Sequence, residues 1–151
     1  MSTILQGSEL RALNFGQRAT KSTGTLAVST VALFTVAGGQ VAITSMYGIV
    51  TTAITVANSY SLQHNPTAGT TVPLFSATDL GTTDTVVGEL LGFTGDAIGS
   101  SLSVGGAVEL LRAPIALAAG QIESVSGGTD GAITWVVSWV PLDPGASLVA
   151  A

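Results

Sequence analysis

Apolar residues alternate with polar residues along most of this chain, at the two-residue spacing of β-strands. The clearest run lies in its last fifth, where Ile133, Trp135, Val137 and Trp139 occupy every second position. Because successive side chains of a strand point to opposite faces, this run predicts a strand with one buried face. Pro141 ends the run, since proline cannot donate a hydrogen bond to a neighbouring strand.

A second long run, Val41 to Val56, is apolar at both sets of alternating positions. One predicted face holds Val41, Ile43, Tyr47 and Ile49, and the other holds Met46, Val50, Ile54 and Val56. Two apolar faces predict a central strand, covered on both sides by its own chain or by a partner chain.

The other elements predicted are short. The run Leu26–Val36 is a predicted strand with a bulge near Ser29 and Thr30, and Ala37–Gln40 is a predicted turn. Shorter strands are predicted at Ser59–His64, Val72–Ser76, Val86–Phe93, Ala107–Arg112 and, as a final hairpin, Gln121–Val125 with Ala132–Val140. Pro114 fits an edge strand or a strand start. Many short strands separated by Gly-rich turns predict an all-β fold, a single β-sandwich or jelly-roll-like domain.

Composition indicates whether the protein is expected in a membrane, outside the cell or in the cytosol. Hydrophobic residues make up 46% of the chain, charged residues only 9%, and the mean hydropathy is +0.59. The most hydrophobic stretch, Leu26–Val56, is interrupted repeatedly by Ser, Thr and Gly, so we do not expect a membrane span. Arg18 and Lys21 before an apolar run imitate a secretory signal, but Glu9 and the interspersed Ser and Thr weigh against one. The absence of Cys fits a reducing cytosol.

Charge divides the chain into two parts. Residues 1–24 hold three of the four cations and one acid, a net charge of +2, whereas residues 25–151 hold one cation and eight acids, a net charge of −7. We therefore expect an extended N-terminal arm at 1–24 and a β-rich domain at 25–151. Within the arm, Leu10 and Leu13 have helical spacing, which predicts a short helical turn from Ser8, its N-cap, to Leu13.

The arm is the predicted partner-binding segment, and the acidic domain argues against binding to nucleic acid. Cations that pair with acidic groups and apolar side chains that fill pockets are the residues such an arm needs. The candidate site residues are Leu10, Arg11, Leu13, Phe15, Arg18 and Lys21.

The sequence contains no motif for catalysis, and we expect no enzyme activity, cofactor or metal site. His64, the single histidine, lacks a Gly-x-Ser-x-Gly nucleophile turn and is predicted to lie in a turn. No calcium loop or phosphate loop is present. Trp135 and Trp139 are predicted to be core residues rather than a sugar platform. The loop acids are predicted to be solvated surface charges: Asp79, Asp84, Glu89 and Asp96.

Two stretches resemble small structural proteins of tailed bacteriophages, often auxiliary proteins of the head. They are the run ending in Val31–Gly39 and the run Trp135–Leu142, followed by an Ala-rich segment. The resemblance lies in the general pattern of the strands over residues 24–151 and excludes the segment before Gly24. It implies a capsid decoration (cement) protein, commonly a homotrimer, whose partner is the major capsid protein. Its place would be the outer head surface of the virion, after assembly in the host cytoplasm.

The leading hypothesis is therefore a virion structural protein that stabilises a bacteriophage capsid through symmetric association and its arm. One alternative is a tail-tube or head–tail connector subunit, which would form rings instead of trimers. Another is a receptor- or glycan-binding module of the virion, which would expose Trp135, Tyr47 or Tyr60 beside Asp or Asn.

Overall fold

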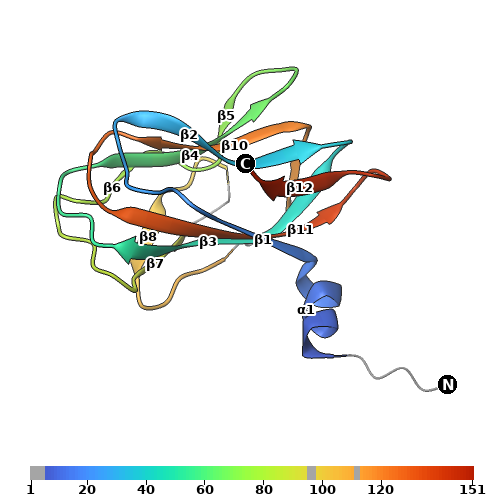
Figure 1. Ribbon diagram of the computed structural model, residues 1–151, viewed down its shortest axis with the longest axis horizontal. Helices are drawn as coiled ribbons and strands as arrows, with labels where there is room; N and C mark the ends of the chain where they lie inside the picture. Colours follow the sequence, from blue (N-terminus) through green and yellow to red (C-terminus); the bar gives the residue numbers. More distant parts are fainter. Residues whose placement is uncertain (1–5, 95–97, 111–112) are drawn as a thin grey trace.

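Two antiparallel sheets pack face to face, with one helix projecting from the sandwich (Figure 1). The computed structural model describes residues 6–94, 98–110 and 113–151. Sheet A has the order β1 (Gln17–Ser22), β11 (Ala132–Pro141), β3 (Val41–Thr52), β7 (Leu90–Phe93) and β8 (Leu102–Gly105), and β9 (Ile115–Leu117) also pairs with β3. Sheet B has the order β12 (Ser147–Ala150), β2 (Ser29–Ala37), β10 (Gly120–Ser126), β4 (Ser59–Pro66) and β5 (Val72–Pro73), and β6 (Thr78–Asp79) also pairs with β4. The predicted all-β sandwich is confirmed.

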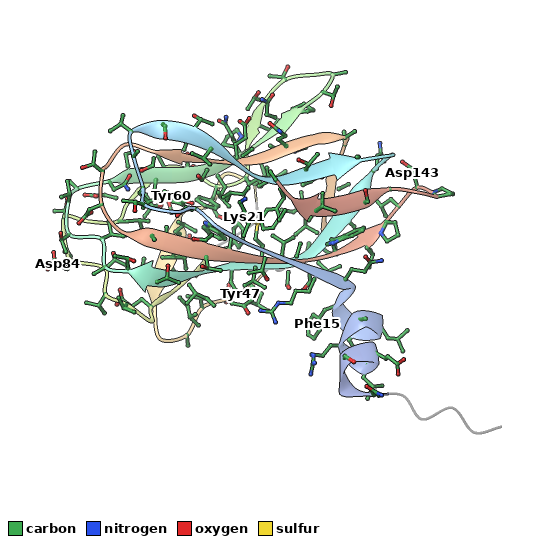
Figure 2. The ribbon with its side chains drawn as sticks, in the orientation of Figure 1. Phe15, Lys21, Tyr47, Tyr60, Asp84 and Asp143 are labelled. Carbon is green, nitrogen blue, oxygen red and sulfur yellow. The ribbon has the colours of Figure 1, made fainter. Side chains whose placement is uncertain are left out.

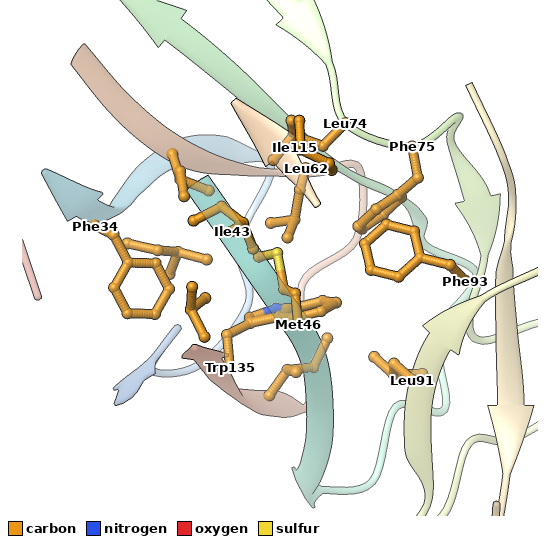
Figure 3. Close-up of a cluster of buried hydrophobic side chains, with 14 of the residues drawn as sticks. Phe34, Ile43, Met46, Leu62, Leu74, Phe75, Leu91, Phe93, Ile115 and Trp135 are labelled. Atoms are coloured by element: carbon orange, nitrogen blue, oxygen red, sulfur yellow. The ribbon is translucent and has the colours of Figure 1, made fainter. Parts of the chain in front are cut away.

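The core lies between the sheets and is centred on Trp135 (Figure 3). The alternating face of β11 points inward as predicted, and Trp135 and Trp139 are buried. Phe75 lies beside the indole, with ring centroids 5.8 Å apart. Burying side chains of this size stabilises the fold by about 1.5–3 kcal/mol each, so this face of β11 anchors both sheets.

A bulge in β3 makes its predicted faces wrong. Opposite β11, the register passes from Ser45 with Ser138 to Ile43 with Trp139, which leaves Thr44 as an extra residue. An extra residue inverts the alternation. Ile43 and Met46 therefore both point inward and are 1% exposed, whereas Tyr47 is half-buried on the outer face.

The bulge in β2 also lies elsewhere than predicted. Against β10, Phe34 pairs with Ile122 and Ala32 pairs with Glu123, so Leu33 is the extra residue. Leu33 and Phe34 are both fully buried, although they are neighbours in sequence. The apparent change of phase near Ser29 and Thr30 reflects only the start of the strand at Ser29.

The final hairpin predicted from the sequence does not form, because β10 belongs to sheet B and β11 to sheet A. Each is a central strand with neighbours on both sides, so neither has an edge left for the other. The connection crosses the sandwich through Gly127 and Gly128, whose backbone N–H groups both donate to Asn58 Oδ1 at 3.0 Å. Asn58 is itself buried and donates to Ser126 Oγ at 3.0 Å.

Several shorter elements differ from the prediction. Residues 107–110 form no strand, residues 111–112 lie outside the described residues, and the strand begins at Ile115, directly after Pro114. Strand β12 was not predicted, because two prolines precede it. Asp143 accepts a hydrogen bond from Gln40 N at 2.7 Å, and the chain then returns to pair with β2.

His64 lies in β4 opposite Ile122, not in a turn, and its side chain is buried. Within the part of the chain that the structure describes, neither imidazole nitrogen makes a hydrogen bond of normal geometry, although backbone groups of Gln121 and Ala118 face the ring. Burial lowers the pKa of His64 more than these groups and nearby Glu123 raise it, so the folded protein holds a neutral imidazole.

We predict that this histidine makes the protein less stable at mildly acidic pH. The unfolded chain binds a proton near the ordinary pKa of 6.5 and the folded protein does so only at lower pH, so stability falls as the pH drops through 6.5. The free energy of unfolding, measured in urea, should be lower at pH 5.5 than at pH 7.5. His64→Leu should remove most of this difference, and an unchanged difference would contradict the assignment.

A second prediction concerns the hydrogen bond from Trp135 Nε1 to the Tyr60 hydroxyl, 2.7 Å long and fully buried. Tyr60→Phe leaves the indole N–H without its acceptor, which should lower the free energy of unfolding by about 1–3 kcal/mol. Tyr47→Phe is the matched control, because Tyr47 is half-exposed and should lose much less. Equal losses in the two variants would show that the Trp135–Tyr60 bond contributes nothing particular.

Candidate protein-binding site

The predicted arm, of which residues 1–5 lie outside the described residues, contains two different structures. Helix α1 (Gly7–Phe15) projects from the sandwich, whereas β1 pairs with β11 from Gln17 opposite Trp139 to Ser22 opposite Thr134 (Figure 1). Arg18 and Lys21 therefore lie on the edge strand of sheet A, and α1 is the part that projects. The helix is longer than the predicted turn and is capped by Gln6 rather than Ser8. The backbone N–H of Gln6 donates to Glu9 Oε2 at 2.7 Å.

Gly16 fixes the angle between the helix and the strand. Its φ is +89°, and a Cβ atom at this position would lie 2.1 Å from the backbone oxygen of Trp139. Only glycine fits so close an approach. The Thr44 hydroxyl, placed by the bulge in β3, donates to the Phe15 carbonyl oxygen and holds the end of the helix on sheet A.

Helix α1 presents apolar side chains without burying any of its residues. Leu13 is 73% exposed, and Leu10 and Phe15 are each 48% exposed. Leu10 and Leu13 lie three residues apart and therefore share one face of the helix. Helices shorter than about 12 residues are marginal in water on their own, so α1 gains most from a surface that packs against it.

A groove of about 390 Å³ separates α1 from the outer face of sheet A. Its central row runs across three strands, because Arg18 pairs with Ser138 and Ser138 pairs with Ser45. Figure 2 shows Phe15 at the base of α1, on the side towards Tyr47. The residues that line the groove include Arg11, Phe15, Arg18, Ser45, Tyr47, Leu110, Val136 and Ser138.

The groove carries positive charge on an acidic protein. Arg11 and Arg18 are two of the four cations of the chain, and none of the described residues that line the groove is Asp or Glu. Within the described ranges neither guanidinium group makes an ion pair. Two unpaired guanidinium groups beside aromatic and aliphatic side chains favour an acidic group attached to an apolar one.

The six predicted site residues thus divide by position. Arg11, Phe15 and Arg18 build the groove, whereas Leu10 and Leu13 do not line it. Lys21 is not part of the groove either, since its ammonium group donates to the backbone oxygen of Ala151 and ties β1 to the segment that follows β12.

Sequence reasoning missed the sheet side of the groove. Tyr47 and Val136 are outward-facing apolar residues of strands that the sequence does predict. Val136 is 3% exposed although it points away from the core. An apolar residue on the outer face of a strand is the available signal, but the bulge at Thr44 hides it for Tyr47.

The residues proposed for glycan binding are mostly inaccessible. Trp135 and Tyr60 are fully buried, and burial raises the pKa of the Tyr60 hydroxyl. Tyr47 is the one of the three that reaches the surface, where it forms a wall of the groove.

Asp130 and Asp79 are loop acids with structural partners. Asp130 accepts hydrogen bonds from the Thr55 hydroxyl at 2.6 Å and from the backbone N–H groups of Thr55 and Val56, which lowers the pKa of its carboxyl group. The Thr82 hydroxyl and backbone N–H groups lower the pKa of Asp79 in the same way. Predicting only solvation was incomplete for Asp79, and also for Glu89, whose carboxylate accepts a hydrogen bond from Val86 N at 2.9 Å, and Asp96 lies outside the described residues.

Across residues 6–94, 98–110 and 113–151, no helix has the length and apolar character needed to cross a membrane. The same residues contain no group of three or more His, Asp or Glu side chains placed to hold a metal ion. Comparison of the chain with protein-family profiles, curated protein sequences and solved structures finds no match.

We predict that Gly16→Ala disrupts the junction of α1 and β1. Gly24→Ala is the matched control, because Gly24 also has a positive φ, +66°, but its Cβ would meet no atom within 4 Å. The backbone conformation alone costs roughly 1–2 kcal/mol in either variant, and Gly16→Ala adds the clash with Trp139. Its free energy of unfolding should fall further than that of Gly24→Ala, and equal losses would show that the close approach is not a constraint.

Proposed function

We propose that the protein is a virion structural protein that decorates and stabilises a bacteriophage capsid. In this proposal it binds the major capsid protein through α1 and associates with copies of itself as a homotrimer. The observation that carries the proposal is the exposure of Leu10 and Leu13 on a helix that has no buried residue among those the structure describes. The resemblance of the strand runs to phage head proteins supplies the setting.

The two leucines are suited to a pocket on a larger surface. Burying each would contribute about 1.5–3 kcal/mol, enough for a weak contact at a single site. A decorating protein repeats the contact over a lattice, and association between copies makes later contacts intramolecular. Weak contacts of this kind then give tight attachment.

The way α1 is joined to the body also supports this role. Strand β1 continues from the helix and pairs along six residues with β11. The inward face of β11 anchors the core. Because Gly16 holds the junction against Trp139, a shell bound to α1 would be connected directly to the sandwich. Such a connection suits a protein that stabilises a shell.

The test uses capsids of the phage that encodes this chain, stripped of the protein, in a co-sedimentation assay. Leu10→Ser with Leu13→Ser should weaken binding by about a hundredfold, since two buried leucines contribute roughly 3 kcal/mol or more. Val28→Ser is the control, because Val28 is 70% exposed but lies in the loop before β2. Both variants should fold, as none of the three side chains is buried.

Binding that is equal for the wild-type protein and the double variant would overturn the role of α1. The number of copies per particle tests the proposed location of the protein in the virion. Trimers on the head lattice agree with decoration, whereas rings at the tail would favour a tail-tube or connector subunit.

A further inference from the structure

One exposed turn carries a negative charge beside aliphatic side chains, and so complements the cationic and aromatic lining of the groove. This turn, here the acidic tip, comprises residues 84–89 between β6 and β7. Val86 and Val87 are 53% and 62% exposed. Asp84 is also exposed, and it makes no ion pair within the described residues. The tip thus presents one free carboxylate beside two aliphatic side chains.

The acidic tip is held in a defined conformation. Thr85 forms a bridge with Ile54, through hydrogen bonds of 2.9 and 3.0 Å between their backbones. The carboxylate of Glu89 accepts a hydrogen bond from Val86 N at 2.9 Å, and Gly88 N donates to Val50 O at 2.9 Å. The two valines are therefore presented without the large ordering cost of a flexible loop.

The acidic tip lies away from the groove of its own chain. Figure 2 shows Asp84 at one end of the long axis of the molecule, and Phe15 and α1 lie well away from it. A contact between the tip and a groove must therefore join two molecules.

We propose that the acidic tip of one copy occupies the groove between α1 and sheet A of the next copy. Val86 and Val87 pack against Phe15 and Tyr47, and Asp84 lies beside the guanidinium groups of Arg11 and Arg18. The charges and the apolar surfaces are complementary in sign and kind. The groove volume of about 390 Å³ lies within the range of about 300–1,000 Å³ in which proteins bind compact groups.

This inference rests on the proposed self-association and specifies its surfaces. The tip and the groove are different surfaces, so the contact is heterologous, and it closes into a ring when the rotation between copies permits. A trimer built this way uses every tip and every groove and leaves Leu10 and Leu13 available for the shell.

The experiment measures mass in solution by analytical ultracentrifugation at about 100 μM, where a contact with a micromolar dissociation constant is saturated. The wild-type protein should be oligomeric. Arg11→Glu with Arg18→Glu reverses the charge of the groove (the groove variant). Val86→Ser with Val87→Ser removes the aliphatic side chains of the acidic tip (the tip variant). Each double variant should be mostly monomeric at this concentration, which corresponds to association weakened by about a thousandfold or more. Val28→Ser with Val149→Ser, which changes two valines of similar exposure, should leave association unchanged.

Mixing the two defective variants gives the sharpest result. The groove variant retains its tip and the tip variant retains its groove, so the mixture should form a one-to-one dimer that neither forms alone. A monomeric wild-type protein, an oligomer unaffected by both double variants, or a mixture that stays monomeric would each overturn the inference. Capsid binding through the leucines can succeed or fail independently, so failure of this contact is distinguishable from failure of the proposed function.

Discussion

The register of β11 is the constraint on which the rest of the structure depends. One face of this strand carries Trp135 and Trp139 into the core, and the other carries Val136 and Ser138 onto the outer surface of sheet A. Its pairing with β1 brings Gly16 against Trp139 and so fixes where α1 leaves the body. A shift of one residue would turn both faces over. The core, the groove and the direction of the helix are therefore set together.

The regular part of this fold can be predicted from the sequence. The alternation of Ile133, Trp135, Val137 and Trp139 identifies an inward face, and Pro114 marks the start of β9. The bulges at Thr44 and Leu33 cannot be predicted in this way. An inserted residue is recognised only against the partner strand, and that partner is distant in sequence. The same limit explains the wrong hairpin, because local pattern does not show that β10 and β11 each pair with two other strands.

The candidate site was predictable in its residue types and not in its arrangement. The few cations and the apolar residues before Gly24 predict a binding segment, but nothing in them shows that the segment changes from helix to strand at Gly16. That change places Arg18 beside Arg11 over sheet A and ties Lys21 to Ala151. The groove also needs Tyr47 and Val136, which come from strands far along the chain. The predicted binding segment therefore forms part of a groove as well as a projecting helix.

Hydrogen exchange of the α1 amides, in the free protein and on the capsid, tests the central claim most directly. A nine-residue helix with no buried residue should exchange its amides quickly in the free protein. On the shell, with Leu10 and Leu13 covered, the same amides should become strongly protected, while those of β11 stay protected in both states. Amides of α1 that exchange equally fast on and off the shell would contradict the account.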